Sequence, residues 1–241
     1  MKNLGFEIKS KGSKISLVFD KKPVFWRRFL SQMIKDKVIL QINEAKKKMK
    51  RENDVEIYNV FNLWRFNEKA KRILKDYGLQ MDLTLLFSGT FSLKKGELFS
   101  TYGHKHEKYF GEFYLVLKNS CFLILSDLES KETKILRLKE NRCAFIHPKY
   151  IHRLTCGKKD SLILGIVPKG AGHDYNIVKG RGFPFHIFLE KSFKIRRNPK
   201  FKSHIFKFKR PKNMKCLKFL KNFKKIEKIL KDPDKFNNFY I

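Results

Sequence analysis

The sequence predicts a mainly β protein built around an antiparallel barrel or a double-sheet jelly roll. The first observation is a series of eight short apolar runs between residues 82 and 190, separated by turn-forming residues. The second is the different character of the two flanks, which mix strands and helices at the N-terminal side and are Lys-rich at the C-terminal side. We therefore expect an N-terminal segment over 1–78 packed on the barrel, the barrel itself over 79–202, and a basic C-terminal extension over 203–241.

The N-terminal segment is expected to begin with strands and to continue with helices. Within residues 1–20, GFEIKS and KISLVF alternate apolar and polar residues around a Gly-Ser pair, which predicts two strands. From residue 23 to about residue 50, apolar side chains recur at spacings of three and four, which predicts a helix. VEIYNVFNLWRF (55–66) is typical of a strand, and KAKRILKDYG (69–78) of a short helix that its final glycine ends.

The barrel region consists of short apolar runs. They are DLTLLF, ELFSTYG, GEFYLVL, CFLILSD, TKILRL, RCAFIH, SLILGIV and PFHIFLE. The segments SGT, KNS, KKD and KGAG between them contain residues that favour turns. No Gly-rich phosphate loop of the Rossmann or P-loop kind occurs, so the sequence does not support nucleotide chemistry of those kinds.

The C-terminal extension is expected to be an amphipathic helix that Pro233 ends. Residues 199–212, which precede it, are dense in Lys, Arg and Phe. The apolar stripe consists of Met214, Leu217, Leu220 (or Phe219), Phe223, Ile226, Ile229 and Leu230. Such a stripe most often packs on the domain, although a basic amphipathic helix also binds RNA or an acidic membrane surface. We expect packing, and we expect removal of 203–241 to leave catalysis intact while lowering any affinity for polyanions.

Charge is the unusual feature of the composition. The chain has 55 Lys and Arg against 23 Asp and Glu, a formal net charge of +32. Such a surface attracts RNA, phosphorylated metabolites and acidic lipids alike. A genome rich in A and T also favours Lys and Phe codons without any partner, so the charge alone does not identify one.

The cysteines indicate a reducing compartment. Cys121, Cys143, Cys156 and Cys216 are far apart and form no C-x-x-C pair, which argues against a zinc ribbon, a redox dithiol or a disulfide framework. No apolar run reaches the roughly 18 residues of a membrane span, and the N-terminus lacks the apolar stretch of a secretory signal. We expect a cytoplasmic protein, with an organelle matrix as the alternative.

The strongest chemical signal is T-Y-G-H-K-H-E-K-Y-F-G-E-F-Y, residues 101–114. Residues two apart in a strand share a face, so His104 and His106 are expected to present two imidazoles to one point. Glu112 on the next strand or turn adds a carboxylate, and His152 in H-P-K-Y-I-H-R adds a third imidazole. This donor set suits a divalent ion such as Fe, Mn, Zn, Ni or Co, with open positions for substrate oxygens. His147 and His186 lack such a context and are interpreted as structural.

These residues also resemble a known family. H-x-H-x5-E followed about forty residues later by P-x-x-x-H is similar to the two-part metal motif of cupins. S-T-Y-G-H-K-H, G-E-F-Y-L-V-L, P-K-Y-I-H-R and above all A-G-H-D-Y (171–175) resemble the archaeal, cupin-type glucose-6-phosphate isomerases. Upstream segments D-V-E-I-Y-N-V-F and D-L-T-L-L are also similar, and N-P-K-F (198–201) resembles the closing strand of that family. The resemblance runs from about residue 27 to 202 and implies a cupin jelly-roll barrel.

The resemblance implies a metal-dependent isomerase that interconverts glucose 6-phosphate and fructose 6-phosphate. It also implies a homodimer and one divalent metal ion (Fe, Mn, Zn or Ni). The implied metal ligands are His104, His106, Glu112 and His152. The implied catalytic residues are Glu112, His173 and Tyr114. The implied substrate and phosphate contacts are Tyr58, Thr84, Thr101, Gly103 and Tyr175. A metal bound to the oxygens at C1 and C2 would polarise the carbonyl, and the hydrogen would move either as a proton through a base such as Glu112 or as a hydride.

The sequence departs from the family pattern at several positions. A glycine is replaced by Asn119, which also tolerates left-handed backbone, and an asparagine is replaced by Cys156. Two family tyrosines correspond to Val167 and Lys149, and the stretch between the two site threonines is longer. We therefore expect the wall of the pocket to differ from that of the family, and we expect substrate preference or turnover to differ with it.

Two other functions compete with the isomerase. The first is a cupin repurposed as an RNA-binding or structural component of a ribonucleoprotein, catalytically weak or inactive, which the net charge and the clusters at 46–51 and 193–202 favour. The second is a different metal cupin, such as a dioxygenase or another sugar-phosphate isomerase, against which the AGHDY segment argues.

Overall fold

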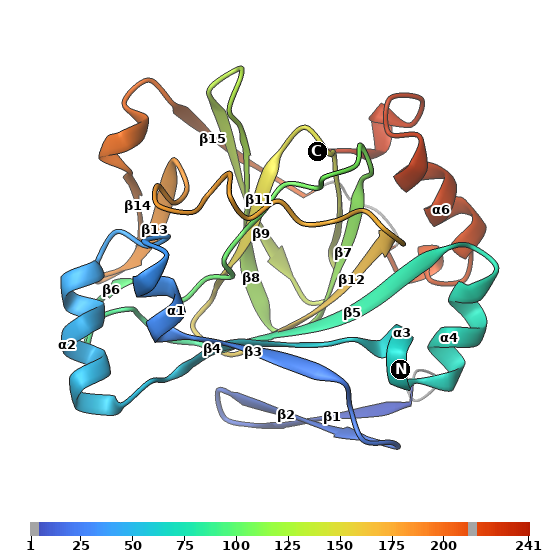
Figure 1. The fold of residues 1–241 in the computed structure, drawn as a ribbon, viewed down its shortest axis with the longest axis horizontal. Coiled ribbons are helices and arrows are strands. Elements are labelled where there is room, and N and C mark those ends of the chain that lie inside the picture. Colours follow the sequence, from blue (N-terminus) through green and yellow to red (C-terminus); the bar gives the residue numbers. More distant parts are fainter. Residues whose placement is uncertain (1–4, 212–215) are drawn as a thin grey trace.

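Antiparallel strands enclose the centre of the molecule, and helices lie at its edges (Figure 1). The computed structural model describes residues 5–211 and 216–241. The strands are β1 (Phe6–Lys11), β2 (Lys14–Phe19), β3 (Phe25–Phe29), β4 (Glu56–Phe61), β5 (Leu79–Leu86), β6 (Gly96–Glu97), β7 (Glu112–Lys118), β8 (Ser120–Asp127), β9 (Glu132–Lys139), β10 (Cys143–Ile146), β11 (Ile151–Cys156), β12 (Ser161–Pro168), β13 (Phe185–Leu189), β14 (Phe193–Arg197) and β15 (Ile205–Lys209). The α-helices are α1 (Leu30–Lys35), α2 (Ile42–Glu52), α3 (Leu63–Phe66), α4 (Glu68–Lys75), α5 (Cys216–Phe219) and α6 (Phe223–Lys231).

The strands form a double-sheet jelly-roll barrel, which confirms the predicted fold class. The largest sheet has the order β10-β7-β12-β5-β4-β3, and the second has the order β11-β8-β9-β15. A smaller sheet, β14-β13-β6, and the β1-β2 hairpin complete the described strands. In the part of the chain that the structure describes, no helix combines the length and apolar character that crossing a membrane requires.

The N-terminal segment corrects two predictions. The hairpin is present as expected, but residues 25–29 form strand β3 rather than the start of a helix, which is confined to α1 and α2. In β3, Phe25 pairs with Phe61 and Trp26 with Val60 of β4, so sheet pairing outweighs the local three-and-four spacing. The predicted strand 55–66 ends at Phe61, and its last residues form α3. Helix α4 follows, close to its expected bounds.

The predicted barrel runs correspond to strands β5, β7, β8, β9, β10, β12 and β13. ELFSTYG is an exception, because only its first residue, Glu97, belongs to a strand (β6), and Leu98 and Ser100 make isolated bridges. Three strands were absent from the predicted series: β11, β14 and β15. The N-P-K-F segment is not a closing strand, since residues 199–201 form a 3-10 turn in which Asn198 accepts a hydrogen bond from the backbone N–H of Lys200.

Within the C-terminal extension, β15 joins the second sheet beside β9, whereas α6 packs on the outer face of the largest sheet, next to β7 and β12 (Figure 1). Ile226, Ile229 and Leu230 of α6 are buried there, as the packing prediction requires. The predicted single helix is divided into α5 and α6, because Asn222 caps α6 by accepting a hydrogen bond from the backbone N–H of Lys225. Met214 lies outside the described residues, and the side chain of Leu217 is not described.

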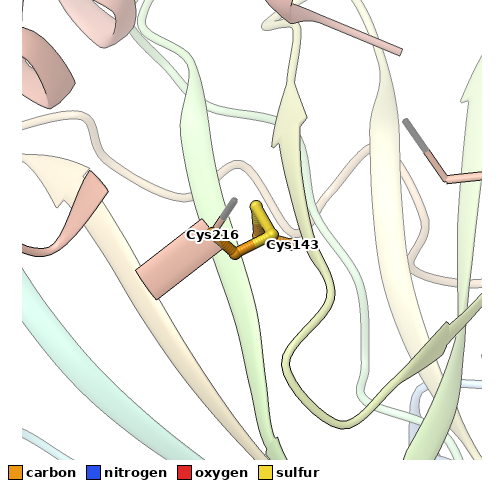
Figure 2. Close-up of a disulfide and its surroundings, with 2 residues drawn as sticks. All are labelled: Cys143 and Cys216. Carbon is orange, nitrogen blue, oxygen red and sulfur yellow. A yellow bond between two sulfur atoms is a disulfide. The ribbon is translucent and has the colours of Figure 1, made fainter. Parts of the chain in front are cut away.

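A disulfide joins the extension to the barrel and corrects the prediction that the cysteines are unpaired. Cys143 of β10 is bonded to Cys216 at the start of α5, as Figure 2 shows. The two residues are 73 positions apart in the sequence, and their Cα atoms lie 5.6 Å apart. The spacing rules detect cysteines that are close in sequence, whereas here the fold brings distant ones together. Cys121 and Cys156 are free and buried.

Alternation along β5 separates the hydrophobic core from a polar cavity. Leu79, Met81, Leu83 and Leu85 face outward into a hydrophobic cluster that also contains α3, α4 and α6. Gln80, Asp82 and Thr84 point to the opposite face, as the two-residue period of a strand requires, and they line a cavity inside the barrel. This strand therefore supplies both a wall of the core and a wall of the candidate site.

Candidate metal centre

Three imidazoles and one carboxylate meet inside the barrel. Their ligand atoms, from His104, His106, Glu112 and His152, all lie within 4.8 Å of one another. The Nε2 atom of His152 lies 2.8 Å from Oε2 of Glu112, and the Nε2 atoms of His106 and His104 lie 3.4 Å and 4.0 Å from the same oxygen. The structure thus brings together all four residues that the sequence singles out as metal ligands.

Backbone hydrogen bonds fix the positions of these side chains. His104 and His152 form an antiparallel bridge, in which the N–H of each donates to the C=O of the other at 3.2 Å and 2.9 Å. Glu112 is the first residue of β7, so the carboxylate enters from the largest sheet, whereas His152 belongs to β11 of the second sheet. The cluster therefore spans the two sheets of the barrel.

The orientation of the imidazoles fits a metal ion. Nδ1 of His106 lies 2.6 Å from the C=O of Phe110, which only accepts, so this nitrogen donates and Nε2 keeps its lone pair. Nε2 of His106 and Nε2 of His104 are buried and have no hydrogen-bond partner among the described residues. Buried polar nitrogens without a partner are unfavourable, and a cation between them and Glu112 would satisfy both. The donor set is that of a borderline divalent ion, and the four residues are compatible with one.

The charges of the cluster also suit a cation. Burial alone would raise the pKa of Glu112, but the adjacent imidazoles of His106 and His152 hold it well below its usual value, so the carboxylate is ionised. Burial lowers the pKa of His104 well below its usual value, and the neighbouring His152 and His173 lower it further, so the ring is neutral. An ionised carboxylate beside a neutral imidazole is the protonation state in which both bind a metal.

The predicted substrate residues line a single cavity of about 520 Å³ next to this cluster. Those on its wall are Tyr58, Thr84, Thr101, Gly103, Tyr114, His173 and Tyr175. The ring of His173 lies 4.4 Å from the ring of His104, at the exposed rim of the cavity. Among the proposed ligands, His104, Glu112 and His152 reach the cavity wall, whereas His106 lies behind them.

Three charged residues that line the cavity were missed from the sequence, namely Arg28, Arg65 and Asp82. Arg28 was assigned to a helix, whereas on β3 its side chain reaches the cavity. Its Nε donates to the hydroxyl of Tyr58 at 3.4 Å, and its guanidinium lies over the rings of Trp26 and Tyr102. Asp82 interrupts the apolar run of β5 on the cavity side. The period-two alternation of β5 was a signal for Asp82, but no local signal indicates the role of Arg28.

The positions that depart from the family pattern lie away from the cavity wall. Cys156, Val167 and Lys149 are not among the residues that line it. Cys156 is buried and donates from Sγ to the C=O of Gly89, and Lys149 pairs with Asp127 at 3.3 Å. The replacing side chains themselves therefore do not form the wall, and an effect of these three replacements on substrate preference or turnover stays a prediction. Asn119 occupies its turn with a φ of 61°, in the left-handed region where a glycine also fits.

The two histidines interpreted as structural have protein partners. His147 lies 3.3 Å from Asp234 of the C-terminal extension. His186 is fully buried, with Nδ1 2.5 Å from Glu97 and Nε2 3.0 Å from the C=O of Phe183. Neither belongs to the metal cluster.

A jelly-roll barrel whose interior holds three imidazoles and a carboxylate around one point is a metal-binding cupin. The family model of glucose-6-phosphate isomerase (GPI) matches residues 31–202. The chain belongs to the glucose-6-phosphate isomerase family.

Curated relatives have the same family name. The glucose-6-phosphate isomerase of Thermococcus litoralis is 30% identical over 163 residues, which are 66% of this chain and 80% of that protein. The glucose-6-phosphate isomerase of Pyrococcus furiosus is 28% identical over 176 residues, 67% of this chain and 91% of that protein. Among solved structures, an oxalate oxidase superposes with a TM-score of 0.33 and 16% identity, over 40% of this chain and 45% of that chain.

Proposed function

We propose that this chain interconverts glucose 6-phosphate and fructose 6-phosphate, with a divalent metal ion held by His104, His106, Glu112 and His152. The observation that supports this function most strongly is the convergence of the four ligand atoms beside a cavity with cationic and hydroxyl side chains. The names of the relatives in Thermococcus and Pyrococcus describe the same activity.

The phosphate end of the substrate fits the part of the cavity near Arg28. Arg28 has no carboxylate within salt-bridge distance among the described residues, so its charge is available to a ligand. Thr84, Thr101 and Gly103 line the same cavity, and the hydroxyl of Tyr58 accepts a hydrogen bond from the N–H of Tyr102 at 3.3 Å. An arginine with hydroxyls and backbone N–H groups is a strong phosphate-binding set, because charge-assisted hydrogen bonds exceed neutral ones.

The reacting end fits the metal cluster. A bound divalent ion would polarise the oxygens at C1 and C2. In a proton route, a base takes the proton from one carbon and returns it to the other, and Glu112 and His173 are the two groups that line the cavity there. Tyr114 would hold a substrate oxygen through its hydroxyl, because burial and the charge of Glu112 raise its pKa and keep it protonated. A hydride route requires no base, and the same residues would then only bind and orient the substrate.

The test of the proposed function is turnover of fructose 6-phosphate in a coupled assay, with the purified protein before and after chelator treatment. We expect activity that the chelator abolishes and that one of Mn, Fe, Ni or Zn restores, with about one ion per chain in the active form. Running the reaction in D2O separates the two hydrogen routes, because only the proton route introduces deuterium from solvent. A protein that binds metal but does not convert fructose 6-phosphate would contradict the proposal.

We also propose RNA as a binding partner of the basic surface. The exposed strand β15 supports RNA binding, since Phe206 and Phe208 are 42% and 60% exposed beside Lys207 and Lys209. RNA affinity that falls steeply with salt would agree with this proposal, and affinity that is insensitive to salt would contradict it. The homodimer rests on the resemblance, and the cytoplasmic location rests on the sequence features given above. Light scattering tests the first and cell fractionation tests the second. No comparison favours a ribonucleoprotein component over the enzyme.

A further inference from the structure

Asp82 occupies a central position on the cavity wall. In β5 it lies between Thr84 and Gln80, whose side chains share its face. Across the sheet, Asp82 pairs with Gly165 of β12, and Gly165 pairs on its other side with Tyr114 of β7. Asp82 and Tyr114 therefore lie in one row across the barrel wall. Strand β12 lies between their two strands, and its residue in this row is Gly165.

Gly165 keeps the space between these two side chains open. A Cβ atom at this position would lie 3.3 Å from the ring of Tyr114 and 3.4 Å from Oε1 of Glu112. The contact with Tyr114 is closer than ordinary van der Waals distance and the contact with Glu112 is at its lower limit, so a side chain would narrow the cavity here. With glycine there, the carboxyl group of Asp82 faces the same space as Tyr114 and the metal cluster.

The carboxyl group of Asp82 is not part of a stabilising ion pair. Nδ2 of Asn62 donates to Oδ1 at 2.8 Å, but no Lys, Arg or His among the described residues forms a salt bridge with it. Burial raises the pKa of Asp82 to about 6, and the hydrogen bond from Asn62 and the charge of Arg65, which lines the same cavity, offset only part of the effect. A half-buried carboxyl group without a salt bridge contributes little to the stability of a fold, whereas it is a good acceptor for hydroxyl groups of a ligand.

The order of residues along the cavity places Asp82 beside the middle of a substrate. If the proposed function holds, the phosphate lies toward Thr84 and Arg28, and C1 and C2 lie toward Glu112. Successive side chains on one face of a strand are roughly 7 Å apart, so the row of Asp82 lies between these two ends. We propose that Asp82 accepts hydrogen bonds from the hydroxyl groups at the middle carbons, C3 to C5, and makes the site selective for their stereochemistry.

The test compares fructose 6-phosphate with its C4 epimer, tagatose 6-phosphate, and its C3 epimer, psicose 6-phosphate. For Asp82→Ala we expect kcat/KM on fructose 6-phosphate to fall roughly ten- to a hundredfold, the range for a lost hydrogen bond to a charged group. The loss of kcat/KM on at least one epimer should be much smaller. The selectivity ratio, kcat/KM on fructose 6-phosphate divided by kcat/KM on that epimer, should therefore fall. Asp82→Asn keeps one acceptor oxygen, so its kcat/KM should lie between that of the unchanged protein and that of Asp82→Ala. Gly165→Ala, which fills the space beside Asp82, should raise KM more than it lowers kcat.

The controls separate recognition from folding and from the proposed function. Asp76→Asn, at an exposed position at the end of α4, should behave as the unchanged protein. Metal content and thermal unfolding are measured for every variant, and Asp82→Asn decides the question if Asp82→Ala does not fold. An unchanged protein without turnover on fructose 6-phosphate overturns the proposed function and this inference with it. An active unchanged protein whose Asp82 variants keep the same selectivity ratio overturns this inference alone.

Discussion

His152 and Glu112 belong to different sheets of the barrel, yet Nε2 of His152 lies 2.8 Å from Oε2 of Glu112. A metal ion bound by both residues would therefore link the two sheets. Ligands that bind only the folded state stabilise it in proportion to their affinity and concentration. The metal site is thus expected to contribute to the stability of the barrel as well as to catalysis.

The first prediction concerns metal removal. Adding a divalent ion at about a hundred times its dissociation constant should raise the free energy of unfolding by about 2.7 kcal/mol, measured by denaturant titration with and without chelator. His152→Ala should lose this increment, bind less than one tenth of an equivalent of metal, and lose turnover more than a hundredfold. His147→Ala, outside the cluster, is the control and should retain its metal. Equal metal content in the two variants would contradict the four-residue site.

The second prediction uses two neighbouring arginines of β3. Arg28 reaches the cavity, whereas Arg27 is exposed and pairs with Glu56 at 2.8 Å. Arg28→Met should reduce kcat/KM for the sugar phosphate roughly ten- to a hundredfold, mainly through KM, because a charged hydrogen bond to phosphate contributes about 1.5–3 kcal/mol. Arg27→Met should change kcat/KM less than twofold. Comparable losses in the two variants would show that Arg28 does not bind the phosphate selectively.

The third prediction concerns the disulfide between Cys143 and Cys216. A link between residues 73 positions apart restricts the unfolded chain, so Cys216→Ser should lower the free energy of unfolding by about 2–4 kcal/mol. Urea titrations without reductant measure the difference, and with dithiothreitol the two proteins should have the same stability. Thiol titration of the unfolded, unreduced protein should find two free cysteines, and four would contradict the bond.

The fourth prediction revises the expectation that residues 203–241 are dispensable. Ile226, Ile229 and Leu230 are fully buried against the outer face of the largest sheet, and the N–H of Gly111 donates to the C=O of Leu230 at 2.8 Å. Burying each of these side chains contributes about 1.5–3 kcal/mol. Truncation at residue 202 should therefore destabilise the barrel by several kcal/mol and lower the yield of active protein. A truncated protein with unchanged thermal unfolding would contradict this packing.

The comparison of sequence and structure shows which signals are local. His104, His106 and Glu112 were predictable, because their spacing and the following strand place them together. Pairing across long distances was not: β3 was predicted as helix because its apolar spacing resembles one, and only its pairing with β4 makes it a strand. The disulfide likewise depends on the extension folding back over the sheet. Arg28 was missed for this reason, since its role depends on which strand carries it.

The last prediction concerns the pH dependence of stability that Asp82 causes. Burial raises its pKa from 3.8 to about 6 in the folded protein, so folding favours the protonated form. Below about pH 4 the carboxyl group is protonated in both states and has no effect. As the pH rises from about 4 to 6, the unfolded chain loses this proton first, so the folded state loses stability, and above about pH 6 the loss is constant. A pKa shift of this size corresponds to a loss of about 3 kcal/mol in the free energy of unfolding. Because solvent reaches the cavity, we expect a loss of about 1–3 kcal/mol.

Asp82→Asn does not titrate, and the other ionisable groups are the same in both proteins, so the difference between them isolates Asp82. Urea unfolding at pH 4, 5, 6 and 7 should show the variant gaining stability relative to the unchanged protein across this range, and no further gain above pH 7. A difference that stays constant from pH 4 to 7 would mean that Asp82 is solvated like a surface carboxylate. Its row between Thr84 and the metal cluster would then be open to water, and the recognition of hydroxyl groups there would lose its physical basis, because water would compete for the same acceptor.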